Sequence, residues 1–370
     1  MHIKTLKLQN FRNYEDARFV LDPAVNLICG ENGQGKTNLL EAAAACSTMR
    51  LFRTAQKKEG LRFGENHAFI FADFLAQERD ISLELRFSRT KAMEIYKNGV
   101  RQKRQSDAQG LLKTVLFCPE DLMLVRAGAA ARRRFLDTAL CQMRPNYARY
   151  LEEYNRLHEH KTRILRDSEE KPSLLSMWED FSLRMAHIGA QIIRYRAYYC
   201  RKLLKATAAV YADIAPHEVL SGVYKTVSSV TDPFADARTI EKQLIDHVFS
   251  HKTAEIAAKS CLSGPHKDDL ELLLDGRSAA SFGSQGQVRT CTLSLKLAER
   301  ELFFDEDGEY PVLLLDDVLS ELDRRRQDFV LNRISAGQVM ITCCEDGISE
   351  KLRAGAVFHI QNGEKSTETH

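Results

Sequence analysis

The sequence predicts an α/β fold built around a phosphate-binding loop, with an all-helical lobe inserted into it. An apolar run near residue 27 leads into a glycine-rich loop, and a second apolar run near residue 313 ends in two aspartates. Both runs are typical of buried strands in a parallel sheet. Between them, from about residue 129 to residue 214, apolar residues recur every three to four positions, as they do in helices. The two halves of the expected site are therefore far apart in the sequence.

The glycine-rich loop spans residues 30–37, with sequence GENGQGKT, and is followed by a helix-like segment at 38–45. Such glycines let backbone N–H groups turn toward a phosphate, and the helix N-terminus adds partial positive charge. In this motif the lysine reaches the β- and γ-phosphates and the threonine hydroxyl binds Mg²⁺. We expect a nucleoside triphosphate here rather than an ordinary glycine turn. The expected ligands are Gly30, Glu31, Asn32, Gly33, Gln34, Gly35, Lys36, Thr37 and Asn38.

The second half of the expected site is the segment 311–317, with sequence PVLLLDD. Four apolar residues followed by two acids predict a central strand with carboxylates at its C-terminal edge, where ligands bind in such sheets. Asp316, with Thr37, is then placed to hold Mg²⁺, and Asp317 to polarise the attacking water, so these aspartates are the candidate catalytic residues. A strand followed by a solvated acidic turn is the alternative, which the loop at 30–37 disfavours.

A third segment, 281–290 with sequence SFGSQGQVRT, precedes a helix-like stretch at 293–304. Ser284 is a suitable N-cap, and the N–H groups at a helix start attract anions. Because one chain does not need two γ-phosphate sites, Ser284, Gly286 and Gln287 could face a nucleotide held by another copy of the protein. A plain helix cap is the alternative.

Together these three segments resemble the ATPase head shared by ABC, Rad50 and SMC proteins. Further segments make the chain similar to the RecF family of bacterial DNA replication and repair proteins, in order and over nearly the whole length. They are residues 8–14 (LQNFRNY), 117–122 (FCPEDL), 264–270 (GPHKDDL), 285–287 (QGQ) and 296–299 (KLAE). The resemblance implies an ABC-type P-loop ATPase head with mixed sheets that binds ATP, and it adds Arg12 to the expected nucleotide ligands.

The resemblance also implies an ATP-gated DNA clamp. ATP and Mg²⁺ would drive a head-to-head homodimer, closure would create a surface for DNA, and hydrolysis would release it. Further implications are service at gapped DNA in recombinational repair, replication-fork maintenance and the SOS response. The expected partners are duplex DNA, single-strand/duplex junctions, and RecR with the RecA-loading machinery. The expected turnover is that of a weak, DNA-stimulated ATPase acting as a switch.

Two departures from the ABC pattern bear on hydrolysis. The histidine that usually follows the strand expected at 338–342 is missing, and Asp317 stands where many such ATPases have Glu. The shorter side chain of Asp317 would hold water less well, so hydrolysis should be slow.

Two other functions are disfavoured. A transporter-type ATPase is disfavoured because the chain lacks a membrane partner domain and carries its lobe in the wrong place. A metabolic P-loop kinase is disfavoured by the Ser284 segment.

The composition is that of a globular protein, with 44 % hydrophobic and 28 % charged residues. Nine cysteines without a Cys-x-x-Cys pair predict free thiols in a reducing cytosol rather than disulfides or a zinc site. No apolar run approaches the ~20 residues of a membrane span, and there is no signal-peptide core, so we expect a cytoplasmic protein with no membrane partner. A net charge of +2 does not by itself indicate nucleic acid.

The periodicities predict an ATPase head at 1–125 and 261–370 and a helical lobe at 126–260, broken at 169–173. The lobe helices are too short for a Rad50- or SMC-type coiled-coil arm. Asn98-Gly99 predicts a hairpin turn. Strands are expected at 3–8, 17–21, 25–29, 68–75, 81–87, 93–96, 100–103, 338–342 and 356–360.

Basic residues are concentrated in one part of the lobe, because residues 181–212 contain arginines and lysines, interleaved with tyrosines, but no Asp or Glu. Such a stripe can line a phosphate backbone, and a solvated helix face is the alternative. The run at 324–326 is expected only to begin a surface helix. The candidate DNA-binding residues are Arg194, Arg196, Arg201 and Lys202 in the lobe, and Arg101, Lys103 and Arg104 in the head.

Overall fold

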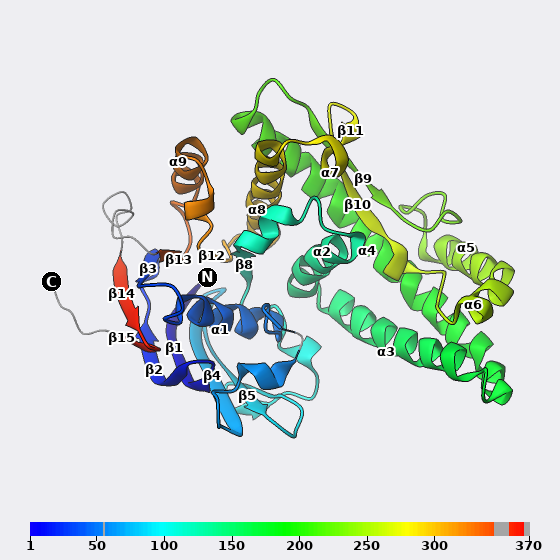
Figure 1. Cartoon of the computed structure of the whole chain (residues 1–370), viewed down its shortest axis with the longest axis horizontal. Helices are drawn as coiled ribbons and strands as arrows, with labels where there is room; N and C mark the ends of the chain where they lie inside the picture. The colour runs from blue at the N-terminus through cyan, green and yellow to red at the C-terminus, as the bar shows by residue number, and fades with distance from the viewer. Residues whose placement is uncertain (55, 344–354, 366–370) are drawn as a thin grey trace. The chain divides into compact units, whose positions relative to one another are not determined.

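The computed structural model describes residues 1–54, 56–343 and 355–365 (Figure 1). The chain divides into two compact units, which we call unit 1 (Met1–Met123 with Thr292–His370) and unit 2 (Leu124–Cys291). The segment 261–291, expected in the head, therefore belongs to unit 2. The reason is strand pairing, since β10 (Asp269–Leu274) pairs along its whole length with β9 (Leu220–Lys225).

Unit 1 contains a six-stranded antiparallel sheet with the order β2-β1-β4-β5-β6-β7. Buried residues alternate with partly exposed ones along β4, so the core packs against one face of the sheet. The hairpin predicted at Asn98-Gly99 is confirmed, with φ angles of 49° and 76° that suit a type I′ turn. The strands are β1 (His2–Phe11), β2 (Tyr14–Val20), β4 (His67–Ala76), β5 (Arg79–Ser88), β6 (Glu94–Lys97) and β7 (Val100–Arg101).

A second six-stranded sheet in unit 1 has the order β15-β14-β3-β13-β12-β8, and its neighbours from β14 to β8 pair in parallel. Both β12 and β13 are buried along their whole length, as central parallel strands are. The short strand β8 was not predicted. The strands are β3 (Val25–Cys29), β8 (Thr114–Phe117), β12 (Val312–Leu315), β13 (Val339–Cys343), β14 (Ala356–Gln361) and β15 (Glu364–Lys365).

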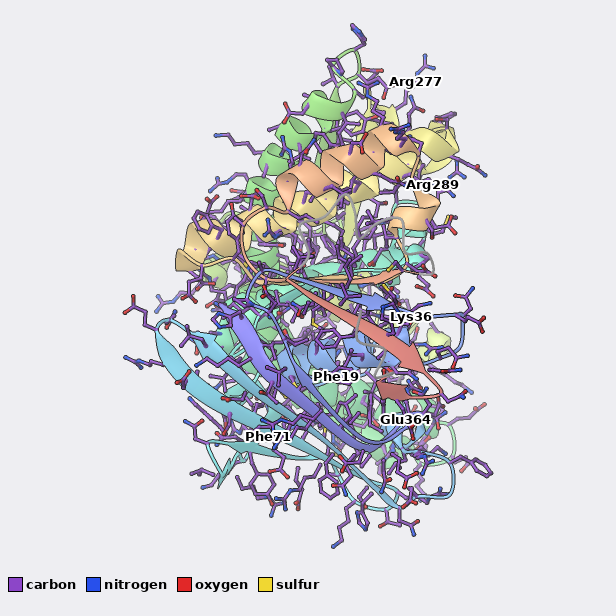
Figure 2. All side chains as sticks on the ribbon, turned by 90° about the vertical axis from the view of Figure 1, so that its left-hand side faces the viewer. Phe19, Lys36, Phe71, Arg277, Arg289 and Glu364 are labelled. Atoms are coloured by element: carbon purple, nitrogen blue, oxygen red, sulfur yellow. The ribbon has the colours of Figure 1, made fainter. Side chains whose placement is uncertain are left out.

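The core of unit 1 joins these two sheets through the helix α1 (Lys36–Thr48), which contacts strands of both. The aromatic ring of Phe19 in β2, which is labelled in Figure 2, meets the ring of Phe358 in β14 edge to face, with their centroids 5.6 Å apart. Among the described residues, the other α-helices of unit 1 are the C-terminal part of α8 (Gln285–Asp307) and α9 (Arg324–Arg333), which begins at the basic run as predicted. The loop and the aspartates at 316 and 317 are thus anchored in one packed body.

Unit 2 is mainly helical, and the helical stripes predicted along α3 and α4 are confirmed by their buried residues. It is not all helical, because β9, β10 and β11 (Arg277–Ser278) form a small antiparallel sheet. Strand β9 was missed because its partner lies about fifty residues further along the chain. The helices are α2 (Ala129–Met143), α3 (Pro145–Asp167), α4 (Trp178–Ile214), α5 (Ala237–Ser250), α6 (Lys252–Ala258) and α7 (Ala279–Phe282).

Short 3₁₀ helices connect several of these elements. They lie at Lys57–Gly60, Gln105–Asp107, Pro119–Met123, Pro172–Met177, Pro265–Lys267 and Leu319–Glu321. None of the helices in the described part of the chain is both long and apolar enough to cross a bilayer.

Candidate nucleotide site

The phosphate-binding loop joins β3 to α1 and depends on glycine at two positions. Gly30 has a φ of 147°, and a Cβ there would collide with the carbonyl oxygen of Ile360 in the neighbouring strand. Gly35 has a φ of 117°, and a Cβ there would lie 2.6 Å from Asn13 Nδ2. L-residues with a Cβ rarely adopt such angles, so both positions require glycine. The loop is therefore shaped by close backbone approach on two sides.

Lys36 is the first residue of α1 and is labelled in Figure 2. Its Nζ donates to the carbonyl oxygens of Gly30 and of Glu31, the latter at 3.1 Å. The side chain is 94 % buried, so its charge acts in surroundings of reduced dielectric constant. A buried ammonium group above a glycine-rich loop at a helix start is suited to binding an anion.

The loop is held by the segment 8–14 and by the hairpin between β14 and β15. Asn13 Nδ2 donates to Gln34 O at 2.8 Å, and the Tyr14 hydroxyl donates to Gly35 O at 3.0 Å. The backbone nitrogens of Asn362 and Gly363 donate to Gln34 Oε1 and O, at 2.6 Å and 3.0 Å. Asn13 and Tyr14 were not predicted as site residues, although their segment was noticed. Their hydrogen bonds hold the apex of the loop in one conformation.

Arg12 binds the helix that follows the loop. Its Nε and Nη2 donate to the two carboxylate oxygens of Glu41 in α1, at 2.8 Å and 3.1 Å, and Nη1 donates to Glu59 O. Glu41 is fully buried, so this two-point ion pair satisfies a charge that would otherwise be costly. In the described contacts Arg12 thus orients α1, and direct binding of nucleotide by Arg12 stays a prediction.

Asp316 follows β12 and meets the start of α1. Its Oδ1 accepts hydrogen bonds from Thr37 Oγ1 at 2.9 Å and from Thr342 Oγ1 at 3.0 Å. Burial raises the pKa of Asp316 above its usual range, and these two hydroxyls oppose that rise. Thr342, at the end of β13, was missed by sequence reasoning, and a hydroxyl residue at the C-terminal edge of a strand is the signal that could have found it. The predicted neighbours Thr37 and Asp316 are brought together.

The oxygens of Thr37 and Asp316 fit a magnesium ion. Mg²⁺ takes oxygen donors and keeps several waters, with one or two carboxylates and the phosphates of its substrate completing the shell. In the described part of the chain, no group of three or more His, Cys, Asp or Glu side chains is arranged to hold a metal. A metal at this position would therefore depend on the hydroxyl, the carboxylate and a bound phosphate together.

Asp317 has a φ of 54°, an unusual backbone conformation for a non-glycine residue. The conformation is held by hydrogen bonds, since its N–H donates to Thr342 Oγ1 at 2.8 Å and its carbonyl accepts from Ser320 Oγ at 2.6 Å. Thr342 thus contacts both aspartates at once. Backbone strain of this kind is concentrated at functional sites.

The segment expected to bind a second nucleotide forms the start of α8 in unit 2. Ser284 Oγ accepts from Gln287 N at 3.2 Å, and Gln287 Oε1 accepts from Ser284 N at 2.8 Å, which is a reciprocal capping box. The predicted N-cap role of Ser284 is therefore confirmed. Gln287 also donates to Glu218 Oε1 at 2.8 Å, while Ser284 is exposed. Contact with a partner's nucleotide stays a prediction.

Two segments used for the family resemblance meet in unit 1. Lys296 Nζ in α8 lies 3.5 Å from Asp121 Oδ2 and 3.7 Å from Glu299 Oε2. Burial raises the pKa of Glu299 to about 7, and the Lys296 ammonium only partly offsets this effect. The group joins the 3₁₀ helix at Pro119–Met123 to α8. The shared segments 117–122 and 296–299 are therefore parts of one buried cluster.

The expectation that Arg196 binds DNA is wrong. The side chain is 97 % buried, and it forms ion pairs with Asp137 at 2.8 Å and Asp268 at 3.0 Å. It also donates to Pro265 O, inside the segment 264–270 used for the family resemblance. Residue 196 faces inward because its position on α4 follows the apolar stripe of Ile192 and Ile193. Arg196 is a structural residue of unit 2.

The remaining basic candidates differ in exposure. Arg201 and Lys202 are exposed on α4, and Arg201 lies 4.9 Å from the ring centroids of both Tyr198 and Phe234. Arg194 is half-buried. In unit 1, Arg101, Lys103 and Arg104 are exposed, and Arg101 pairs with Glu94 at 2.8 Å. Their contact with DNA stays a prediction.

The phosphate-binding loop and Asp316 come from opposite ends of the sequence and meet at Thr37. This arrangement defines a P-loop head of the RecF/RecN/SMC class. The model of the RecF/RecN/SMC N terminal domain matches residues 2–367. Similarity to individual proteins narrows the class. The chain belongs to the RecF family of DNA replication and repair proteins.

Its relatives match nearly the whole chain. It is 37 % identical over 369 residues to the DNA replication and repair protein RecF of Bacillus subtilis (strain 168), covering 98 % of this chain and 99 % of that protein. It is 36 % identical over 373 residues to the RecF of Lactobacillus johnsonii, covering 100 % of both.

Solved structures agree with this assignment. A structure of the recombination mediator protein RecF-ATPrS in the RecFOR pathway matches with a TM-score of 0.92 at 30 % identity, covering 100 % of this chain and 98 % of that one. The Smc head domain from Pyrococcus furiosus matches with a TM-score of 0.56 at 15 % identity, covering 99 % of this chain and 95 % of that one. The second likeness concerns the fold alone, and it agrees with the predicted head.

Proposed function

We propose that this protein is an ATP-gated DNA clamp of recombinational repair and replication-fork maintenance. ATP and Mg²⁺ drive head-to-head dimerisation, and the closed dimer binds DNA at gaps, including single-strand/duplex junctions. Slow hydrolysis then releases the DNA. In this role the protein assists RecA loading together with RecR. RecF-family membership disfavours both a transporter-type ATPase and a metabolic kinase.

The observation that carries the proposal is the contact between Thr37 and Asp316 beside Lys36. A triphosphate entering the loop would replace the carbonyls of Gly30 and Glu31 as partners of the Lys36 ammonium. The hydroxyl and carboxylate, 2.9 Å apart, would hold Mg²⁺ against the same phosphates. Binding of ATP and binding of the metal are thereby made mutually dependent.

Slow hydrolysis is supported by the residue at position 317. Its carboxylate follows directly on the Mg²⁺ ligand, and its backbone is fixed through Thr342 and Ser320. A carboxylate in this place can orient the attacking water. Aspartate has one methylene fewer than the glutamate common in related ATPases, so water would be held less well. The nucleotide then acts as a timer for DNA release.

Dimerisation is supported by the exposure of Ser284 at the start of α8. The helix start is capped within its own chain, yet the serine faces solvent where an incoming γ-phosphate could meet it. A shared site explains why one chain carries both a phosphate loop and a second anion-binding segment. The DNA-binding role of the exposed basic residues follows from closure, which would present two copies of each to one duplex.

Mass in solution, measured by light scattering with and without ATP and Mg²⁺, tests the proposal. The wild type should become dimeric only with both. Lys36→Met should lose nucleotide binding, whereas Ser284→Arg should bind ATP and remain monomeric. Ser173→Arg, which adds the same charge at an exposed residue of unit 2, should dimerise like the wild type. Normal dimerisation of Ser284→Arg would refute the shared site.

A further inference from the structure

Two cysteines meet directly beneath the phosphate-binding loop. Cys29 is the last residue of β3 and Cys343 the last residue of β13, and the two are paired in the register of these neighbouring parallel strands. Their Sγ atoms lie 3.0 Å apart. Each residue is 97 % buried, and both are reduced thiols in this structure.

The geometry permits a covalent bond without repacking the sheet. Neighbouring strands lie about 4.8 Å apart, within the Cα separation of about 4.4–6.8 Å that disulfides accept. A disulfide has an S–S length of about 2.05 Å, so the two sulfurs need to approach by about 1 Å. An approach of about 1 Å between the two sulfurs is small for side chains. It is large for the tightly packed phosphate-binding loop, which begins directly after Cys29.

We propose that Cys29 and Cys343 form a site of reversible thiol oxidation that disables the phosphate-binding loop. The oxidant is a small peroxide. One thiol is oxidised to a sulfenic acid, with transfer of one peroxide oxygen and release of water. The second sulfur attacks the sulfenic sulfur, the S–S bond forms, and the hydroxyl leaves with the thiol proton as a second water. Two thiols and one hydrogen peroxide thus give one disulfide and two waters.

The effect on the loop follows from the chain sequence, since Gly30 is bonded directly to Cys29. Gly30 has a constrained φ of 147°, lies against the carbonyl of Ile360, and accepts a hydrogen bond from Lys36. The backbone of Gly30 therefore cannot adjust when Cys29 is displaced. Oxidation should move the Gly30 carbonyl and the Lys36 ammonium away from their positions. The consequence for nucleotide binding rests on the proposed function, whereas formation of the disulfide does not.

Other buried cysteines provide the control. Cys200 lies in α4 of unit 2 and is 99 % buried, and burial raises the pKa of its thiol. Cys200 is also remote in sequence from the loop, and no step proposed for the nucleotide involves it. Cys200→Ala therefore removes a cysteine while leaving the proposed pair intact.

The experiment treats full-length protein with hydrogen peroxide and maps its peptides without reduction. We expect a Cys29–Cys343 cross-linked peptide that dithiothreitol removes. ATP binding by the oxidised protein should be weaker by about tenfold or more, as expected for loss of one charge-assisted hydrogen bond, and should return on reduction. Cys29→Ala and Cys343→Ala should each abolish the cross-link and keep ATP affinity under peroxide, while Cys200→Ala should behave as wild type.

Three results would overturn the proposal. They are the absence of this cross-link, a bond between Cys343 and its sequence neighbour Cys344 in its place, and unchanged ATP affinity in fully cross-linked protein. Having two single variants guards against failure of one to fold. If the reduced wild type fails to bind ATP, the proposed function fails, and the peptide map still decides whether the disulfide forms.

Discussion

Replacing Thr342 by valine should disturb both aspartates of the site. The hydroxyl donates to Asp316 at 3.0 Å and accepts from the N–H of Asp317 at 2.8 Å, and the residue is 98 % buried. Valine has a similar shape, so packing is kept while both hydrogen bonds are removed. A hydrogen bond to a charged group contributes about 1.5–3 kcal/mol, and an unpaired buried N–H costs about 1–3 kcal/mol. The fall in the free energy of unfolding should be on the order of 3 kcal/mol.

Urea unfolding measures this fall, and ATP turnover reports its effect on the site. The variant should also need a higher pH for turnover, because the pKa of Asp316, already raised by burial, loses one of the two hydroxyls that lower it. Thr342→Ser keeps the hydroxyl and should stay close to wild type in both assays. Wild-type stability and turnover in Thr342→Val would show that this hydroxyl positions neither aspartate.

Three further predictions concern charged side chains. Asp317→Asn should bind ATP and accumulate as a dimer, with ATP turnover roughly 10²-fold lower than in the wild type. Asp316→Asn should instead weaken the Mg²⁺-dependent binding of ATP. If each variant showed the behaviour expected of the other, the roles of the two aspartates would be reversed. Burial raises the pKa of Glu299 from 4.5 to about 7, so its contribution to stability is present below pH 4.5 and is lost as the pH rises through 7. Glu299→Gln should thus be more stable than wild type at pH 8, by up to about 3 kcal/mol in urea unfolding, and this difference should shrink at pH 5; equal curves at both pH values would contradict it. Changing Arg201 and Lys202 together to Gln should weaken the salt dependence of ATP-dependent DNA binding. The slope of log binding constant against log salt concentration should flatten by about 0.9 for each phosphate that is no longer neutralised. An unchanged slope would indicate that the DNA-binding surface lies elsewhere, and Arg101, Lys103 and Arg104 would be tested next.

The sequence was most informative where local chemistry alone determines structure. The loop at 30–37 combines glycines, a lysine and a threonine that act together in one turn, and the buried strand before Asp316 is recognisable from four apolar residues. Both predictions needed only neighbouring residues. The cap at Ser284 belongs to the same group, because the serine and Gln287 satisfy each other within one helical turn.

What could not be predicted depends on contacts between distant segments. Arg196 lies in a stretch that contains arginines and lysines but no acidic residue. Only the packing of α4 against the segment 264–270 reveals that Arg196 is buried with Asp137 and Asp268. Thr342 lies beside both aspartates because β13 is placed between β12 and β3. This strand order cannot be deduced from the amino-acid composition of the strands. The six residues of β9 likewise look like a strand only once β10 is beside them.

The hairpin at Asn362 and Gly363 makes the loop depend on a segment that lies far from it in the sequence. These two residues hold Gln34, and β14 pairs in parallel with β3 across more than three hundred residues. Contacts of such long sequence separation form slowly, because the chain entropy of closing the intervening loop must be overcome first. The phosphate-binding loop should therefore reach its ordered conformation late in folding, after β3 and β14 have paired.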